Sequence, residues 1–462
     1  MTPNPLLTTP IAAMRAPVSA GLSRSLAWRL EQLDRLEGLL RDHEGEVLEA
    51  LAADLGKPPL EANFELVGVR KELAHTRRQL KGWMGPRPVV LDLILRPGHT
   101  WIQAEPLGCV LIIGPWNYPF KLCLQPLVSA LAAGNTAVLK PSEHAPSTAE
   151  LLARSIPQAF SAEVVQVVSG DGAVAAALIE QQFDHIFFTG GGRVGRLVLA
   201  AAARHLTPVT LELGGKNPAI VLADADIATT ARRLAWGKGL NAGQSCVAPD
   251  HLLVQSQARA ALVAAIAAEW VRFYGADPLA SEDLGCIVND AQFSRLEELL
   301  AGARSRGQVL AGGRSDPARR RIEPTLVAVE SGDDPLMQAE LFGPILPVLS
   351  VANLEEALAE VRSRPKPLAI YLFSHDRTAQ QRTLATTSSG GVCFNDVVLQ
   401  EVAAALPFGG VGESGMGSYH GKSGFLTFSH QRAVLRRPFW LDLPFRYPPY
   451  AGKLALMKWL LG

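Results

Sequence analysis

The chain has 462 residues, of which 48% are hydrophobic and 19% are charged, so it can bury a sizeable core in two or three structural units. Lys plus Arg and Asp plus Glu both number 44, and this balance leaves no basic surface of the kind that binds nucleic acid. The five cysteines form no C-x-x-C pair, so neither a disulfide framework nor a metal site is indicated.

Residues 1–20 carry one basic residue, Arg15, preceded by three prolines, and contain no apolar segment of the kind found in signal peptides. No segment of the sequence approaches the roughly 20 apolar residues that a membrane span requires. We therefore expect a soluble, cytoplasmic protein in a reducing compartment.

Leucines at three- and four-residue steps predict a long amphipathic helix over residues 21–55, which Gly56 ends. Residues 60–82 continue the helical pattern until prolines break it. Val89–Leu95 and Thr100–Glu105 then predict a β-hairpin around a Pro-Gly turn.

From residue 107 onward, short segments rich in Val, Ile and Phe alternate with helical ones. The predicted strands are Cys109–Ile113, Thr136–Lys140, Val164–Val168 and His185–Thr189. The predicted helices are 120–133, 147–159, 173–181 and 193–203. This alternation indicates a parallel, doubly wound sheet, which binds ligands beyond the carboxyl ends of its strands. A second α/β region follows, with strands at Ala219–Leu222, Leu252–Val254 and Pro347–Leu349.

Two glycine clusters have the G-x-G-x-x-G spacing. The cluster at 410–415 follows no predicted strand, which favours a simple glycine-rich loop. The cluster at 190–195 follows a predicted strand and precedes a helix, so its backbone N–H groups suit a pyrophosphate.

The sequence offers two sites for the ribose of a dinucleotide. The acid that usually binds it lies about 20 residues after the glycines, which points to Glu212. Lys140-Pro-Ser-Glu143 follows another predicted strand and places an ammonium and a carboxylate at its carboxyl end. The alternative for this tetrapeptide is a turn in which Ser142 caps the next helix, and the local sequence favours neither.

Cys246 is the candidate nucleophile. It lies in Gly-Leu-Asn-Ala-Gly-Gln-Ser-Cys-Val-Ala-Pro-Asp, residues 239–250, among small residues that a substrate can approach. Glu212, in Leu-Glu-Leu-Gly-Gly-Lys earlier in the chain, can activate a water molecule. A thiol and a distant carboxylate predict covalent catalysis through a thioester, whereas a buried structural thiol is the alternative.

Seven segments in order resemble the aldehyde dehydrogenase superfamily over nearly the whole chain. They are Pro115-Trp-Asn-Tyr-Pro119, Lys140-Pro-Ser-Glu143, Phe188-Thr-Gly190, Leu211-Glu-Leu-Gly-Gly-Lys216, Gly243-Gln-Ser-Cys246, Glu340-Leu-Phe-Gly-Pro344 and Pro407-Phe-Gly-Gly410. Asn395-Asp396 and the segments 415–422 and 428–432 are similar to the class 3 branch.

The resemblance implies an α/β fold of the aldehyde dehydrogenase type. It would comprise a Rossmann-type parallel-sheet cofactor domain, an α/β catalytic domain and a small β oligomerisation element. The cofactor domain would be 1–84 and 106–211, and the catalytic domain 212–393. Residues 85–105 and 394–440 would form the oligomerisation element, and 441–462 a C-terminal tail.

The resemblance also implies the catalytic roles. Cys246 is expected to attack the aldehyde as a thiolate, giving a thiohemiacetal and then a thioester. Asn117 is expected to stabilise the oxyanion with its side-chain amide, although a turn would also explain an Asn before Tyr-Pro. Glu212 is expected to act as general base in hydrolysis, which leaves the ribose to the Lys-Pro-Ser-Glu segment. A CoA-acylating dehydrogenase is the alternative, and Glu212 argues against it.

The implied cofactor is NAD, with NADP accepted if Glu143 can swing away from a 2′-phosphate. Lys140 and Glu143 would hold the adenosine ribose, and Gly190 and Gly195 the diphosphate. Relatives often carry Ser or Asn where this chain has Gly191, so the diphosphate would depend more on backbone contacts here.

At the other end of the cofactor, Glu340 is expected to bind the nicotinamide ribose, with Phe342 beside it, and Trp116 is placed in the same site. No basic residue clearly targets a substrate carboxylate. The expected substrate is therefore a medium- or long-chain aliphatic aldehyde, or a bulky aromatic or isoprenoid one. The expected channel residues are Tyr118, Trp236, Gly239, Leu240 and Phe408.

A homodimer is expected by analogy with class 3 relatives. The segment 453–462 is apolar with two lysines and is too short to span a membrane. Packing over the channel or against a partner subunit is favoured for this tail over weak association with a membrane surface.

Overall fold

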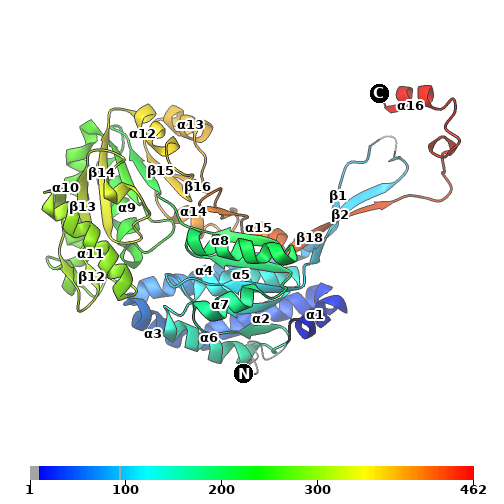
Figure 1. The fold of residues 1–462 in the computed structure, drawn as a ribbon, viewed down its shortest axis with the longest axis horizontal. Coiled ribbons are helices and arrows are strands. Elements are labelled where there is room, and N and C mark those ends of the chain that lie inside the picture. The colour runs from blue at the N-terminus through cyan, green and yellow to red at the C-terminus, as the bar shows by residue number, and fades with distance from the viewer. Residues whose placement is uncertain (1–9, 93–94, 462) are drawn as a thin grey trace.

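A computed structural model describes residues 10–92 and 95–461 and shows two α/β lobes joined to a slender β arm (Figure 1). None of the helices in these residues is both long and apolar enough to cross a lipid bilayer. The elements and their order explain how residues far apart in the sequence reach one site.

The first lobe is built on a six-stranded sheet in the order β17-β7-β6-β3-β4-β5. Five strands are parallel and β17 pairs antiparallel at one edge. In β3, Val110 and Ile112 are buried on one face, and Cys109, Leu111 and Ile113 on the other, so the strand is apolar throughout. The strands are β3 (Cys109–Ile113), β4 (Thr136–Lys140), β5 (Val165–Val167), β6 (His185–Thr189), β7 (Val209–Glu212) and β17 (Gly415–Met416).

Helices cover both faces of this sheet, as the doubly wound pattern predicted. α5 (Lys121–Ala133) and α6 (Pro146–Ala159) lie on one face with the N-terminal helices. α1 (Ile11–Ser19), which the sequence pattern did not predict, covers the other face together with α7 (Gly172–Ile179) and α8 (Gly192–Ala202).

The single helix predicted over 21–55 is wrong. Leu22–Arg24 is a short 3-10 turn, and the rest divides at His43 into α2 (Leu26–Asp42) and α3 (Glu44–Leu55). Both halves keep leucines at helical spacing, but α2 packs against α5 whereas α3 packs against α6. Gly56 ends α3 in the left-handed conformation with φ +61°, as predicted. α4 (Pro59–Met84) matches the second predicted helix.

The second lobe contains a seven-stranded sheet in the order β10-β13-β14-β9-β8-β15-β16, parallel except for β10. Its strands are β8 (Pro218–Val221), β9 (His251–Gln255), β10 (Val309–Ala311), β13 (Thr325–Val329), β14 (Ile345–Val351), β15 (Ala369–Phe373) and β16 (Gly391–Phe394). Its helices are α9 (Ile227–Gly239), α10 (Ser256–Tyr274), α11 (Asp290–Ser305), α12 (Leu354–Arg362) and α13 (Arg377–Thr386), and β11 (Ser315–Asp316) pairs with β12 (Arg321–Ile322) beside them.

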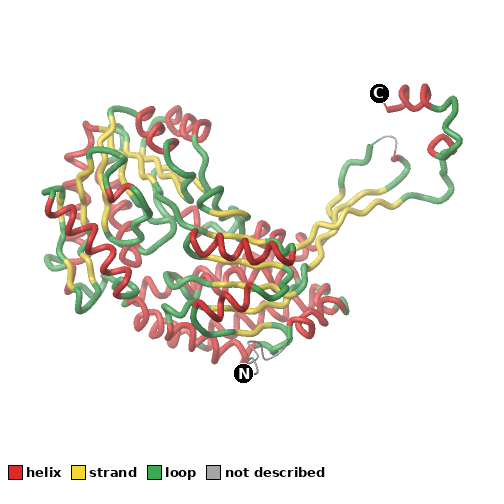
Figure 2. Tube along the Cα trace, viewed as in Figure 1, coloured by secondary structure: helices red, strands yellow, loops and turns green. Residues whose placement is uncertain are grey.

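The arm is a three-stranded antiparallel sheet in the order β1-β2-β18 and extends away from both lobes (Figure 2). The antiparallel pairing and the second strand of the hairpin predicted for 89–105 are confirmed, because β1 pairs with β2. The bounds of its first strand are wrong, since β1 covers only Arg87–Pro88, and residues 93–94 lie outside the described residues. The main partner of β2 (His99–Pro106) is β18 (Ser429–Arg436), more than 300 residues later in the chain. α14 (Leu399–Val402) and α15 (Gly421–Thr427) precede β18, and α16 (Leu454–Leu461) lies at the outer end of the arm (Figure 1).

Candidate active site

Cys246 lies between the two lobes, on the loop that joins the 3-10 turn Leu240–Gly243 to β9. Asn241 and Ala242 have φ of +52° and +51°, a conformation that costs free energy for residues with a side chain. Asn241 offsets that cost with hydrogen bonds, since its backbone N–H donates to Glu61 at 2.9 Å and its amide donates to the Gln244 carbonyl at 3.0 Å.

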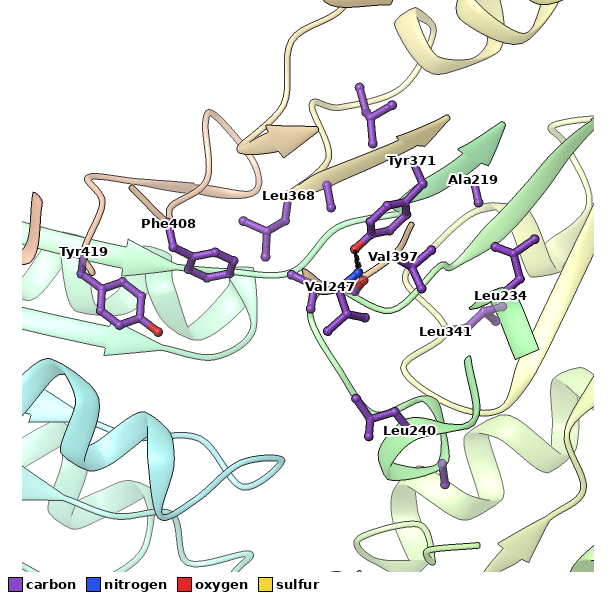
Figure 3. Packing of buried hydrophobic residues seen from close by; sticks show 14 of the residues in the cluster. Ala219, Leu234, Leu240, Val247, Leu341, Leu368, Tyr371, Val397, Phe408 and Tyr419 are labelled. Carbon is purple, nitrogen blue, oxygen red and sulfur yellow. Dashed lines mark hydrogen bonds between the residues drawn. The ribbon is translucent and has the colours of Figure 1, made fainter. Parts of the chain in front are cut away.

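Two side chains from the second lobe hold the backbone of Cys246 and of the residue that follows it. The Asn217 amide donates to the Cys246 carbonyl at 2.7 Å, and the Tyr371 hydroxyl donates to the Val247 carbonyl at 2.5 Å (Figure 3). The sequence analysis missed both residues. Asn217 directly follows the Leu-Glu-Leu-Gly-Gly-Lys segment, which was the available signal.

Asn117 is buried in the loop between β3 and α5, opposite the cysteine loop. Its amide donates to the Gln244 carbonyl at 3.2 Å, two residues before Cys246. Its own carbonyl accepts hydrogen bonds from Lys57 at 2.8 Å and from Asn241 at 2.9 Å. The structure therefore brings Asn117 to the cysteine loop and holds it there from both sides.

Glu212 is the last residue of β7 and is 3% exposed. Neither oxygen of its carboxyl group has a hydrogen-bond partner among the described residues. Burial raises the pKa of Glu212 well above its usual range, because the charged form is not solvated. A buried carboxyl group without partners is costly for the fold, which indicates a functional role.

The thiol of Cys246 is surrounded by acidic groups. Burial raises its pKa, and the charges of Glu340, Glu401 and Glu212 raise it further, whereas that of Lys121 lowers it. The thiolate is the nucleophilic form. Because its surroundings oppose ionisation, the fraction of Cys246 present as thiolate should increase with pH.

Lys140 ends β4 and is buried, while Glu143 remains exposed. The Lys140 ammonium donates to Glu143 at 2.9 Å and to the Pro141 carbonyl at 3.0 Å. Burial opposes the charge on Glu143, but hydrogen bonds from Lys140 and from its own backbone bring its pKa below the usual value. A charged pair thus stands at the carboxyl end of a parallel strand, where such sheets bind ligands.

Ser142 forms a turn but does not cap α6. Its hydroxyl accepts from the His144 N–H at 3.2 Å. The first N–H groups of α6, those of Ser147 and Thr148, donate instead to Asp54 of α3 at 2.9 and 2.8 Å.

The N-terminus of α8 is the predicted position of the diphosphate. Gly191 makes no side-chain capping bond, and a Cβ built there would meet nothing within 4 Å. The buried hydroxyl of Thr189 has no hydrogen-bond partner among the described residues. Gly195 lets α8 approach the sheet, because a Cβ there would lie 3.0 Å from Leu213. By contrast, Asp or Asn side chains cap five other helices, at Asp171, Asp226, Asn289, Asn353 and Asp376.

Glu340, Phe342 and Trp116 form a second group of candidate cofactor residues. Glu340 accepts a hydrogen bond from the Gly215 N–H at 3.1 Å, and burial raises its pKa to about 8. Gly214 is required beneath it, since a Cβ there would lie 2.1 Å from a Glu340 oxygen. Phe342 packs edge-on against Trp116 with a centroid distance of 5.2 Å. The backbone N–H groups at the N-terminus of α8 suit a diphosphate and the edge-on aromatic pair suits a nicotinamide, so these residues fit a dinucleotide.

A cavity of about 300 Å³ opens onto Cys246 from the side of α4, α5 and α14. Four residues that the sequence placed in a substrate channel line this cavity, namely Tyr118, Trp236, Leu240 and Phe408. Phe408 stacks on His420 with a centroid distance of 5.3 Å, and Figure 3 shows it beside Tyr419. The sequence analysis missed most of the opposite wall, which consists of Asn63, Phe64, Val67, Gly68, Lys71, Lys121, Leu122, Gln125, Leu399, Glu401, Val402, Ala404 and Tyr419.

One expectation about the channel needs correction. Gly239 does not line the cavity but faces α10, since a Cβ there would lie 2.1 Å from the Tyr274 hydroxyl. Two basic residues, Lys71 and Lys121, also line the cavity. Residues 10–92 and 95–461 contain no cluster of three or more His, Cys, Asp or Glu side chains that could hold a metal ion.

Comparisons with known proteins agree with this geometry. The model of the aldehyde dehydrogenase family matches residues 11–434. Aldehyde dehydrogenase family 3 member H1 of Arabidopsis thaliana is 44% identical over 454 residues, covering 98% of this chain and 94% of the relative. The dimeric NADP-preferring aldehyde dehydrogenase of Canis lupus familiaris is 43% identical over 444 residues, covering 96% and 97%. A solved structure of the substrate-bound state of Staphylococcus aureus AldH matches with a TM-score of 0.94 and 41% identity, covering 98% of each chain. The class 3 resemblance is thereby confirmed, and the chain belongs to the aldehyde dehydrogenase family.

Proposed function

We propose that the chain oxidises an aldehyde to the carboxylic acid with NAD or NADP, through a thiohemiacetal and a thioester on Cys246. The observation that carries the proposal is the position of Cys246, onto which an apolar cavity opens. The carboxyl group of Glu212, which has no hydrogen-bond partner among the described residues, is close enough to influence the ionisation of the thiol. An aldehyde can reach the thiol through the cavity. The carboxyl oxygens of Glu212 make no hydrogen bond to other described residues and can therefore accept one from a water molecule.

In the first step the Cys246 thiol releases its proton to solvent, and the resulting thiolate attacks the aldehyde carbon, which forms a C–S bond and moves the carbonyl electron pair onto oxygen. The Asn117 amide has two N–H donors, and one is bonded to the Gln244 carbonyl. The other can stabilise the oxyanion in place of a solvent molecule. The hydrogen bonds to the Asn117 carbonyl fix the direction of this donor.

The residues described above fit NAD or NADP. Lys140 and Glu143 would hold the adenosine ribose, the N-terminus of α8 with Gly190 and Gly195 the diphosphate, and Glu340 the nicotinamide ribose. When bound, the nicotinamide supplies a hydride acceptor. The exposed carboxylate of Glu143 would repel a 2′-phosphate, so we propose NAD as the better cofactor, although the relative from Canis lupus familiaris is named as NADP-preferring.

In the last step Glu212 takes a proton from water, which attacks the thioester carbon and releases the acid and the thiol. A raised pKa makes Glu212 a stronger base than an exposed carboxylate. Because this base is present, we propose hydrolysis rather than acyl transfer to CoA, and an assay without added CoA tests that choice.

Two variants test the assignment. Glu212→Gln should retain cofactor binding and a single burst of NADH while losing steady-state turnover, since acylation precedes the step that needs the base. Cys246→Ala should give neither burst nor turnover. Unchanged steady-state rates in either variant would refute the corresponding role.

The cavity supports a medium- or long-chain aliphatic, or a bulky aromatic or isoprenoid, aldehyde as substrate. Its lining is mainly apolar, with side chains such as Phe64, Val67, Leu399 and Val402 facing the entry. Burial of each additional methylene contributes about 0.8 kcal/mol. The value of kcat/KM should therefore rise from acetaldehyde to octanal, and a preference for acetaldehyde would contradict the proposal.

We also propose a homodimer formed through the arm. The edge strand β18 has unpaired backbone groups on one side, and Phe439 and Trp440 beyond it are exposed. The α16 helix lies far from the cavity of its own chain (Figure 1), and Trp459 is 80% exposed. Contact with a partner subunit or a membrane surface would cover it. Light scattering of the full chain tests whether it is a dimer. Liposome binding with and without residues 452–462 tests whether the C-terminal helix contacts a membrane surface.

A further inference from the structure

Lys121 and Glu401 place an ion pair in the wall of the aldehyde cavity. Lys121 is the first residue of α5 and Glu401 belongs to the short helix α14. The ammonium lies 2.5 Å from a Glu401 oxygen, and the side chains are only 13% and 11% exposed. The other basic residue in the lining, Lys71, is exposed to solvent, where water screens its charge.

The path of the Lys121 side chain depends on Gly68 of α4. A Cβ at Gly68 would lie 2.9 Å from Lys121 Cε and 3.1 Å from Cδ. The absence of a side chain lets the lysine stem lie along α4 and brings its ammonium to the cavity. The ammonium is 6.0 Å from the ring centroid of Tyr118, the neighbour of the oxyanion residue Asn117.

Glu401 is the group that balances this ammonium. His420 also lies beside this pair, with its Nε2 3.9 Å from Glu401 and 2.9 Å from the Gln125 amide. Burial lowers the pKa of His420 to about 4, so it is neutral at pH 7. Burial also opposes the charge on Glu401, but Lys121 outweighs it and holds the pKa of Glu401 below its usual value. Glu401 is therefore ionised beside the Lys121 ammonium, and the two opposite charges offset each other.

We propose that Glu401 determines the charge specificity of the cavity, because it neutralises Lys121 and so selects neutral aldehydes over aldehydes that carry a carboxylate. The inference rests on the proposed function, in which the aldehyde occupies this cavity. A substrate carboxylate entering the cavity would have to displace Glu401 from its 2.5 Å contact while losing its own hydration. A neutral chain meets no such cost.

The test compares hexanal with adipic semialdehyde, which have equal chain length and differ only in the terminal carboxylate. Glu401→Gln removes the negative charge and keeps the shape, so Lys121 becomes free to pair with the substrate. The ratio of kcat/KM for adipic semialdehyde to that for hexanal should rise about ten-fold, equivalent to about 1.4 kcal/mol. Lys121→Met in the Glu401→Gln background should remove this gain.

Glu401→Asp is the matched control, since it keeps the charge and should keep the wild-type ratio. If Glu401→Gln changes both substrates by the same factor, or if the gain persists without Lys121, the inference is overturned and the pair is only structural. Failure of the proposed function would look different. In that case the wild-type protein would oxidise neither substrate, or Cys246→Ala would remain active.

Discussion

Lys57 supports the active site from behind, and its replacement by Met should be strongly destabilising. Its side chain is 1% exposed, and its ammonium donates to Glu65 at 2.5 Å and to the Asn117 carbonyl at 2.8 Å. The second oxygen of Glu65, which is fully buried, accepts from the N–H groups of Phe120 and Lys121 at 3.0 and 2.9 Å. The pair therefore joins α4 to the loop that carries Asn117.

Methionine fills most of the volume of Lys57 but leaves Glu65 as a buried charge without a counter-ion. Removing one partner of a buried ion pair costs about 3–5 kcal/mol, and we expect a loss in this range for the first lobe. The value of kcat should fall as well, because the Asn117 carbonyl loses its 2.8 Å donor and the loop is less well positioned.

The measurement is urea unfolding followed by circular dichroism, with the midpoint compared at equal slope. Lys57→Met with Glu65→Gln is the informative second variant, since a neutral amide removes the uncompensated charge. It should recover at least half of the lost stability while kcat stays low. A loss below about 1 kcal/mol in Lys57→Met, as for an exposed ion pair, would refute this reasoning, and so would a double variant less stable than the single one.

Three further predictions concern pH, cofactor choice and stability. Burial raises the pKa values of Cys246 and Glu212, so more of each group is protonated, and therefore inactive, at neutral pH. The value of kcat/KM should therefore rise between about pH 6 and 9, and a flat profile across that range would contradict this prediction. Glu143→Ala should raise kcat/KM for NADP relative to NAD by about ten-fold or less, measured at saturating aldehyde, and no change would show that Glu143 does not face the 2′ position. Asp54→Ala removes the acceptor for the first N–H groups of α6 and should cost about 0.5–2 kcal/mol in the same urea assay, whereas an unchanged midpoint would mean that water replaces it.

Four strands of the first lobe, β3 to β6, and the order of the catalytic segments were predictable from local sequence, whereas β7 and β17 were not. The strands at 109–113, 136–140 and 185–189 were predicted with the bounds that the structure shows. Their signal is local, because a strand buried on both faces is apolar at every position. The segments around Asn117, Glu212 and Cys246 were equally recognisable, since each consists of adjacent residues.

Only the tertiary structure decided which distant segments meet. The pairing of β2 with β18, the Lys57–Glu65 pair behind Asn117 and the Lys121–Glu401 pair in the cavity all join residues whose local sequence carries no sign of the partner. Gly239 shows the same limit, because helical position alone does not tell whether a residue faces the cavity or α10. Periodicity identifies a helix and its apolar side, but the packing of whole lobes selects which side chains from α4, α5 and α14 surround the thiol.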